Sequence, residues 1–177
     1  MKVSMIIGVM LFAHGSCLLA SEWFVNEFND EFWFDEAAYG NGTWVVVGGL
    51  GIRYSSDALV WHRVDEANTL DDRFKGITFA GGYFVASGNS YDTVGEGHIA
   101  FSNDGIHWHT TEKPEVYNNL VNRHDKIVFN DGNWVAAGAN LLHSNNLNDW
   151  TEVLNEGGTT LAYGNGRFVF VSWYGSR

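Results

Sequence analysis

The residues with side chains suited to chemistry gather in two polar stretches between apolar segments. Residues 89–98 contain Tyr91, Asp92, Glu96 and His98, and residues 112–126 contain Tyr117, Arg123 and His124. Carboxylate, imidazole and guanidinium groups beside tyrosine rings can hydrogen-bond and stack on a ligand. We expect these seven side chains to form a binding site for protein or carbohydrate. An ordinary solvated loop is the simpler explanation for any one of them taken alone.

The spacing of ligand-type residues argues against a metal or a cofactor. Asp92, Glu96 and His98 lack the alternating acidic ligands of a calcium loop. His107 and His109 are expected on one strand face, and two ligands do not make a zinc site. The sequence has no glycine-rich phosphate motif, nucleophile elbow or Cys-x-x-Cys pair. We therefore predict no metal site and no cofactor.

Four copies of one phrase are expected to form the scaffold beneath these loops. Each copy has an apolar strand ending in an aromatic residue, two residues drawn from Asn, Asp and Gly, and a second apolar strand. The copies occupy residues 37–48, 77–88, 127–138 and 161–172. Asn and Gly accept the positive φ of a tight primed turn. Each copy therefore predicts a hairpin, and the continuous apolar character of its second strand predicts burial on both faces.

A second phrase follows the first three hairpins and places a serine six residues before a tryptophan. Asp or Asn at its third position can accept hydrogen bonds from the amides of its own turn. The tryptophan is expected to pack the returning strand against the core. We interpret these positions as structural; they are Ser55, Asp57, Trp61, Ser102, Asp104, Trp108, Ser144, Asn146 and Trp150.

Together the two phrases predict units of four strands. The units cover about residues 36–66, 76–112, 126–156 and 160–177, and the last has only two strands. Four strands in about 40–45 residues is the period of a β-propeller blade. The predicted fold class is all-β, a propeller of four-stranded blades with three complete units and a partial fourth. A sandwich of irregular hairpins is the alternative.

The turn Ser102–Trp108 reads Ser-x-Asp-Gly-x-x-Trp. It resembles the Asp-box (BNR) repeat of sialidases, sortilin-like receptors and photosystem II assembly factors. The resemblance covers residues 36–172 and implies a propeller with its functional side opposite the Asp boxes. Ala58 and the pair Asn146-Leu147 depart from the motif, and we expect them to be tolerated turn variants.

Sialidase-type catalysis is the main enzymatic alternative. That chemistry needs arginines that clamp a carboxylate and a tyrosine nucleophile supported by an acid. Arg53 and Arg63 are expected on neighbouring strands and Arg167 in a turn on the Asp-box side, so three converging arginines are not available. We predict a non-catalytic binding module. A fragment of a sialidase-like glycoside hydrolase and an assembly or stability factor for an exported complex are the alternatives.

The first 20 residues have the layout of a secretory signal peptide. Lys2 precedes an apolar run, and small residues lead to a polar junction at Ser21. We expect a secreted, periplasmic or envelope protein, with a retained anchor or a lipid on Cys17 as alternatives. The net charge of −11 repels phosphate backbones, so nucleic acid is not an expected partner.

The partial fourth unit leaves three expectations about its completion. Residues 23–27 resemble the fourth strand of a unit, such as residues 150–154, and could be added to it. Alternatively the chain self-associates through the incomplete unit, or it is part of a longer propeller. An open strand edge is prone to association.

Overall fold

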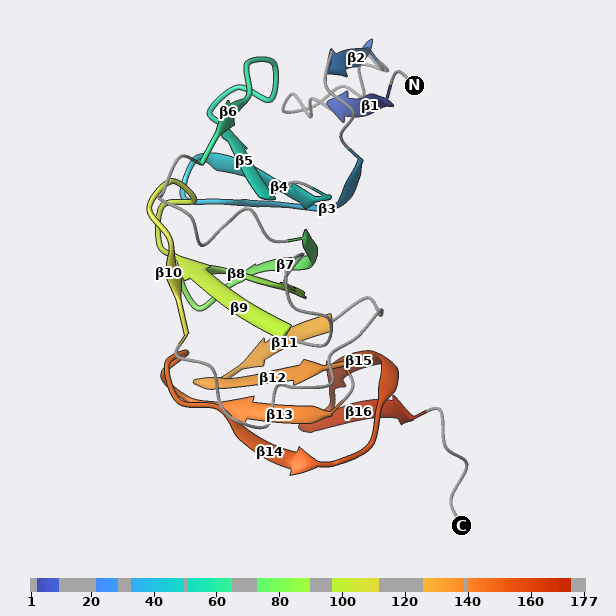
Figure 1. Cartoon of the computed structure of the whole chain (residues 1–177), viewed down its shortest axis with the longest axis vertical. Helices are drawn as coiled ribbons and strands as arrows, with labels where there is room; N and C mark the ends of the chain where they lie inside the picture. The colour runs from blue at the N-terminus through green and yellow to red at the C-terminus, as the bar shows by residue number, and fades with distance from the viewer. Residues whose placement is uncertain are drawn as a thin grey trace, which may run out of the picture. The chain divides into compact units, whose positions relative to one another are not determined.

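The computed structural model describes eight stretches of the chain: residues 3–9, 22–28, 33–49, 51–64, 73–89, 97–111, 126–138 and 140–172. Within these stretches every regular element is a strand (Figure 1). The chain divides into two parts, Met1–Trp33 and Phe34–Arg177. No helix in the described stretches is long and apolar enough to cross a membrane.

The described residues of the first part form one antiparallel pair, β1 (Val3–Val9) and β2 (Glu22–Phe28). The strand expected at residues 23–27 is therefore present as β2. It pairs with β1, whereas the sequence led us to expect pairing with the fourth unit. β1 lies within the first 20 residues, for which the signal peptide stays a prediction.

The second part contains three four-stranded antiparallel sheets and a hairpin. The first unit is β3 (Phe34–Gly40), β4 (Thr43–Gly48), β5 (Gly51–Ser55) and β6 (His62–Arg63). The second is β7 (Arg73–Ala80), β8 (Tyr83–Asn89), β9 (Gly97–Ser102) and β10 (His109–Thr110). The third is β11 (Lys126–Asn130), β12 (Asn133–Ala137), β13 (Leu141–Ser144) and β14 (Thr151–Leu154). The fourth is β15 (Gly158–Gly164) and β16 (Arg167–Ser172). Strands consecutive in the sequence are neighbours in each sheet, which confirms the predicted four-strand units.

Each unit begins with a hairpin closed by a two-residue turn in which both residues have positive φ. In the first unit these values are 47° at Asn41 and 79° at Gly42. An aromatic pair faces across the strands next to every turn, with ring centroids 4.6 Å apart for Tyr39 and Trp44. The positive φ values match the right-handed twist of the strands, so the hairpins form where the sequence predicted them.

The hydrophobic core lies between the sheets, because each unit packs on the next (Figure 1). Val45 and Val47 on β4 pack in a cluster with Phe84 on β8 of the second unit. On the opposite face of β8, Val85 packs in a cluster with Trp134 of the third unit. Each second strand of the first three units is therefore buried on both sides, as its continuous apolar sequence predicted.

We call the hairpin of the first two strands of a unit its inner hairpin. Successive units approach closely at its turn. A Cβ added to Gly40 would lie 2.2 Å from the ring of Phe79, the aromatic residue that ends β7 of the next unit. Gly164 occupies the same position of the repeat in the fourth unit, and nothing described lies within 4 Å of a Cβ added there. Gly40 is buried and Gly164 is exposed.

Replacing these two glycines by alanine separates close packing from backbone effects. Gly40→Ala should destabilise the fold by about 1–3 kcal/mol, since the methyl group overlaps the Phe79 ring. Gly164→Ala should leave the free energy of unfolding unchanged or raise it by up to about 1 kcal/mol. Urea denaturation of both variants measures the difference, and equal effects would contradict the packing argument.

Candidate functional site

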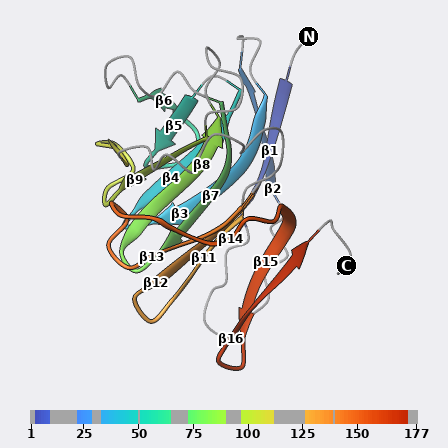
Figure 2. The ribbon, with the colours of Figure 1, turned by 60° about the horizontal axis from the view of Figure 1, so that its bottom comes forward.

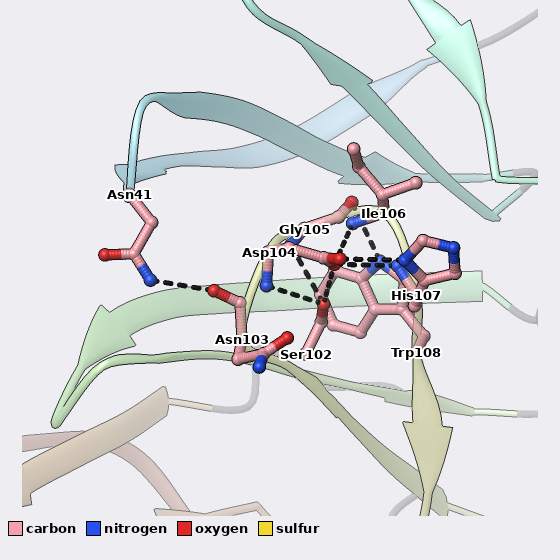
Figure 3. Close-up of polar contacts among 8 residues, drawn as sticks. All are labelled: Asn41, Ser102, Asn103, Asp104, Gly105, Ile106, His107 and Trp108. Atoms are coloured by element: carbon pink, nitrogen blue, oxygen red, sulfur yellow. Dashed lines mark hydrogen bonds and ion pairs between the residues drawn. The ribbon is translucent and has the colours of Figure 1, made fainter.

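We call the three turns whose sequence resembles the Asp box, residues 55–61, 102–108 and 144–150, the Asp-box turns. They lie at one end of the sheets, beside the inner-hairpin turns. Each turn starts from a buried serine whose hydroxyl oxygen accepts hydrogen bonds from the second and third following amides. In the second unit the Ser102 Oγ lies 3.3 Å from the Asp104 nitrogen and 2.9 Å from the Gly105 nitrogen (Figure 3). Ser55 and Ser144 make the same two contacts in their own turns.

The acidic or amide side chain at the third position holds the second half of each turn. The Asp104 Oδ1 accepts hydrogen bonds of 2.8 Å from the amides of Ile106 and His107. Asp57 and Asn146 accept from the two equivalent amides of their turns. These three side chains accept hydrogen bonds from the backbone of their own turns, so the geometry gives them a structural role.

The tryptophan closes each turn by donating its indole N–H to a carbonyl of the same turn. The Trp108 Nε1 lies 3.0 Å from the carbonyl oxygen of Gly105, and Trp150 makes the same bond at 3.0 Å to Leu147. Trp61 donates to Ala58 at 3.2 Å. Trp108 and Trp150 are each 6% exposed, which places their rings in the core.

The two sequence variants keep the backbone of the motif. Ala58 and Leu147 have φ of 62° and 67°, close to the 78° of Gly105. A left-handed conformation costs a residue with a Cβ of the order of 1 kcal/mol. Gly105 is required in its own turn because an added Cβ would lie 2.7 Å from Val45 Cγ2 of the first unit.

The second Asp box also joins the first unit by a polar contact. The Asn41 Nδ2 donates a 2.8 Å hydrogen bond to the carbonyl oxygen of Asn103 (Figure 3). Asn41 is a turn residue of the first hairpin. The bond therefore joins the inner-hairpin turn of the first unit to the Asp-box turn of the second. The sequence identified both turns but not the bond between them.

The sixth position of the turn carries a contact that the sequence reasoning missed. The His107 Nδ1 lies 2.7 Å from the Asp104 Oδ2, and in the third turn Asn146 Nδ2 donates to Asp149 Oδ2 at 2.8 Å. The carboxylate of this pair stands at the third position in the second turn (Asp104) and at the sixth position in the third turn (Asp149). Comparing positions three and six of the phrase across the repeats would have suggested this pair.

A second missed group links the first strands of three units. Glu36 on β3 accepts a 2.9 Å hydrogen bond from the amide of Ile77 on β7, and its other oxygen lies 3.1 Å from Lys126 Nζ on β11. Glu36 and Lys126 occupy the same position of the repeat, opposite Val47 and Ala137. Opposite charges at one repeat position were the signal available in the sequence.

The longer connections join the sheets at the end opposite the Asp boxes. In the second unit, residues 65–72 lead into Arg73, residues 90–96 connect Asn89 to Gly97, and residues 112–125 leave from Thr111. Arg73 pairs with Asn89, Asn89 pairs with Gly97, and the Thr111 amide donates to the Ile99 carbonyl. These hydrogen bonds bring the attachment points of all three connections to one end of one sheet.

Most of the predicted binding residues lie outside the described part of the chain. They are Tyr91, Asp92, Glu96, Tyr117, Arg123 and His124. His98 is described by its backbone, which lies in β9 opposite Gly88. The structure therefore shows where the connections that carry these residues leave and enter the sheet. That their side chains come together in one site stays a prediction.

The described arginines are spread over different places in the sheets. Arg53 and Arg63 are cross-strand neighbours in the first unit. Arg73 begins β7 in the second unit, and Arg167 begins β16 beside the fourth hairpin turn. Arg73 and Arg167 therefore belong to opposite ends of their sheets. Arg167, which was expected in the turn itself, is instead the first residue of the strand that follows the turn.

Comparisons with known proteins give two negative results and a set of distant structural similarities. No protein-family profile and no curated sequence matches the chain. A member of the GH130 family, which contains glycoside hydrolases that target β-1,2 mannosidic linkages in Candida mannan, is 18% identical. The TM-score is 0.45, and the matched region covers 69% of this chain and 48% of the GH130 protein. The Bombyx mori GH32 β-fructofuranosidase is also 18% identical, with a TM-score of 0.44, over 78% of this chain and 40% of its own.

The chain thus spans about half the length of these solved structures or less. At such identities and TM-scores, the similarities do not decide the activity of this chain.

Removing the serine hydroxyl tests the importance of the turn. Ser102→Ala should lower the free energy of unfolding by about 1–3 kcal/mol, because the amide of buried Gly105 loses its acceptor. Ser56→Ala, at an exposed position of the first turn, serves as the control and should change it little. Equal urea midpoints for the two variants would exclude the proposed role of the hydroxyl.

The Asp-box carboxylates also predict a loss of stability in acid. Burial raises the pKa of Asp104, but hydrogen bonds from the His107 side chain and from the amides of His107 and Ile106 outweigh it and hold that pKa well below its usual value. Amides of Val60 and Leu59 lower the pKa of Asp57. A carboxyl group whose pKa is lower in the folded than in the unfolded state stabilises the folded state at pH values above its unfolded-state pKa of about 3.9. This contribution to the free energy of unfolding is lost as the pH falls from there toward the folded-state pKa.

Asp104→Asn measures the part of this effect that belongs to one turn. The stability difference between the wild type and Asp104→Asn should shrink between pH 7 and pH 3, since only the wild type titrates at this position. Asn146 shows that an amide fits the same position of the third turn. Urea denaturation at several pH values provides the measurement, and a difference independent of pH would contradict it.

Proposed function

We propose that this chain is an exported, non-catalytic β-propeller module that binds protein or carbohydrate at the end of its sheets opposite the Asp boxes. The four-stranded units are its blades. The observation that supports the site most directly is the convergence of three long connections on one end of the second sheet.

The scaffold beneath this site is suited to presenting loops. Residues 90–96 leave and re-enter a continuous antiparallel ladder, in which Asn89 pairs with Gly97 and Gly88 with His98. The neighbouring interior residues Ile99 and Ala100 are 1% and 0% exposed. Loops on a rigid base lose less conformational entropy on binding, and binding residues concentrate on such loops.

The composition of the connections sets the chemistry of the ligand. Tyr91 and Tyr117 supply aromatic faces, and Asp92, Glu96 and Arg123 supply hydrogen-bonding groups. Aromatic rings with a few polar groups fit the alternating apolar and hydroxyl surfaces of a sugar, or a polar peptide. The Asp-box carboxylates are engaged by their own turns and are not available for acid–base chemistry.

Exchanging one connection tests the location of the site. Replacing residues 90–96 by Gly-Asn, which retains the Asn89–Gly97 closure, should weaken ligand binding at least about tenfold. Arrays of defined oligosaccharides and of peptides, probed with the full chain and with the variant, provide the measurement. Unchanged binding by the variant would place the site elsewhere.

The matched control lies at the opposite end of the same sheet. Tyr83→Ala removes a ring that is 41% exposed beside the inner-hairpin turn, and it should leave array binding unchanged. Sugar release from the same oligosaccharides, measured in parallel, distinguishes the glycoside hydrolase alternative. Release that is lost in the loop variant would replace the binding proposal by that alternative.

A further inference from the structure

The outer face of the fourth unit departs from the pattern set by the other three. The same repeat position is filled by Val45, Val85, Val135 and Val169, which are 0%, 0%, 6% and 58% exposed. Two positions later, Val47 and Ala137 are 0% and 1% exposed, whereas Val171 is 49% exposed. In the first three units the following unit covers this face. We call the open face of β15 and β16 the tail; it carries Ala162, Gly164, Val169 and Val171. Figure 2 shows the hairpin formed by these two strands.

The first unit has a complementary open surface on the other side. Tyr39 is 54% exposed, although its equivalents Phe79 and Phe129 are half-buried against the preceding unit. Ala37 is exposed, whereas its equivalents Ile77 and Ile127 are 5% and 4% exposed. We call this outer face of β3 the head. On β4, Val46 of the same face is 1% exposed.

The contact inside the chain shows what fits the tail. In each internal interface, the first strand of the following unit lies against the inner hairpin of the preceding one: β7 on β3 and β4, β11 on β7 and β8, and β15 on β11 and β12. The aromatic residue ending that first strand seats on the turn, as the Phe79 ring does on Gly40. The part of the head that is open, β3 with Tyr39, is the part that makes this contact.

We propose that the head of a second copy of this chain binds the tail, with its Tyr39 ring seated on Gly164. The interface repeats the internal one, since Gly164 replaces Gly40 and Tyr39 replaces Phe79. Gly164 has the open space that such a ring needs, with nothing described within 4 Å of its Cβ direction. Because head and tail are different surfaces, the contact is heterologous and closes into a ring or extends with concentration.

This proposal is independent of the ligand site at the other end of the sheets. The head and tail lie on sheet faces, whereas the proposed ligand site lies where residues 90–96 and 112–125 join the second unit. A failure of self-association leaves the ligand site unaffected, and the loop exchange leaves the head and tail unaffected.

Sedimentation of the full chain and four variants tests the inference. The wild type should associate. Val169→Lys and Tyr39→Lys should each weaken association on the order of 100-fold, because they bury an unpaired charge. Val60→Lys changes a valine of the same 58% exposure in an Asp-box turn and should associate like the wild type. Gly164→Ala, which adds only an apolar methyl group, should weaken association about tenfold without destabilising the fold.

A mixture of the two lysine variants decides the geometry. Val169→Lys retains a competent head and Tyr39→Lys retains a competent tail, so equal amounts should form a one-to-one heterodimer while each alone stays monomeric. Near-ultraviolet circular dichroism confirms that each variant is folded. A monomeric wild type, self-association of Tyr39→Lys alone, or dissociation caused by Val60→Lys would each overturn the proposal.

Discussion

The burial of both faces of the second strand in each of the first three units is the constraint on which the rest of the structure depends. Phe84, Val85 and Ala86 are consecutive in β8 and are each 0% exposed, so they need apolar cover on both sides. One sheet cannot cover both of its own faces. Units must therefore pack in series, and each interface buries one face from each neighbour. The open valines of β16 follow from the same constraint at the last unit described.

Close packing in series requires that the ends of the strands turn tightly without projecting into the neighbour. The two-residue hairpin turns and the Asp boxes meet this requirement, because their amides are satisfied by side chains within the turn. Gly40 and Gly105 stand where a neighbouring unit approaches too closely for a Cβ. The residues that identify the repeat are thus those that let one unit approach the next.

This division of labour explains why the two ends of the sheets differ. At the Asp-box end, turn contacts such as Asn41 with Asn103 join successive units, so length changes there would break the packing. At the opposite end the Gly158 amide donates a 2.9 Å hydrogen bond to the Gly138 carbonyl, which joins the third and fourth units. The other connections there vary from two residues after β4 to the longer segment 90–96. Variation without loss of stability is what a ligand site on a rigid scaffold needs.

The sequence by itself determined the strands, the turns and their order, because these depend on local properties: apolar runs, and Asn, Asp and Gly at positions of positive φ. It did not determine that Asn41 donates to Asn103, that Glu36 reaches Ile77 and Lys126, or that Tyr39 and Gly164 are open where Phe79 and Gly40 are joined. These contacts join residues whose proximity arises only when the units stack, and so the tertiary structure alone decided them.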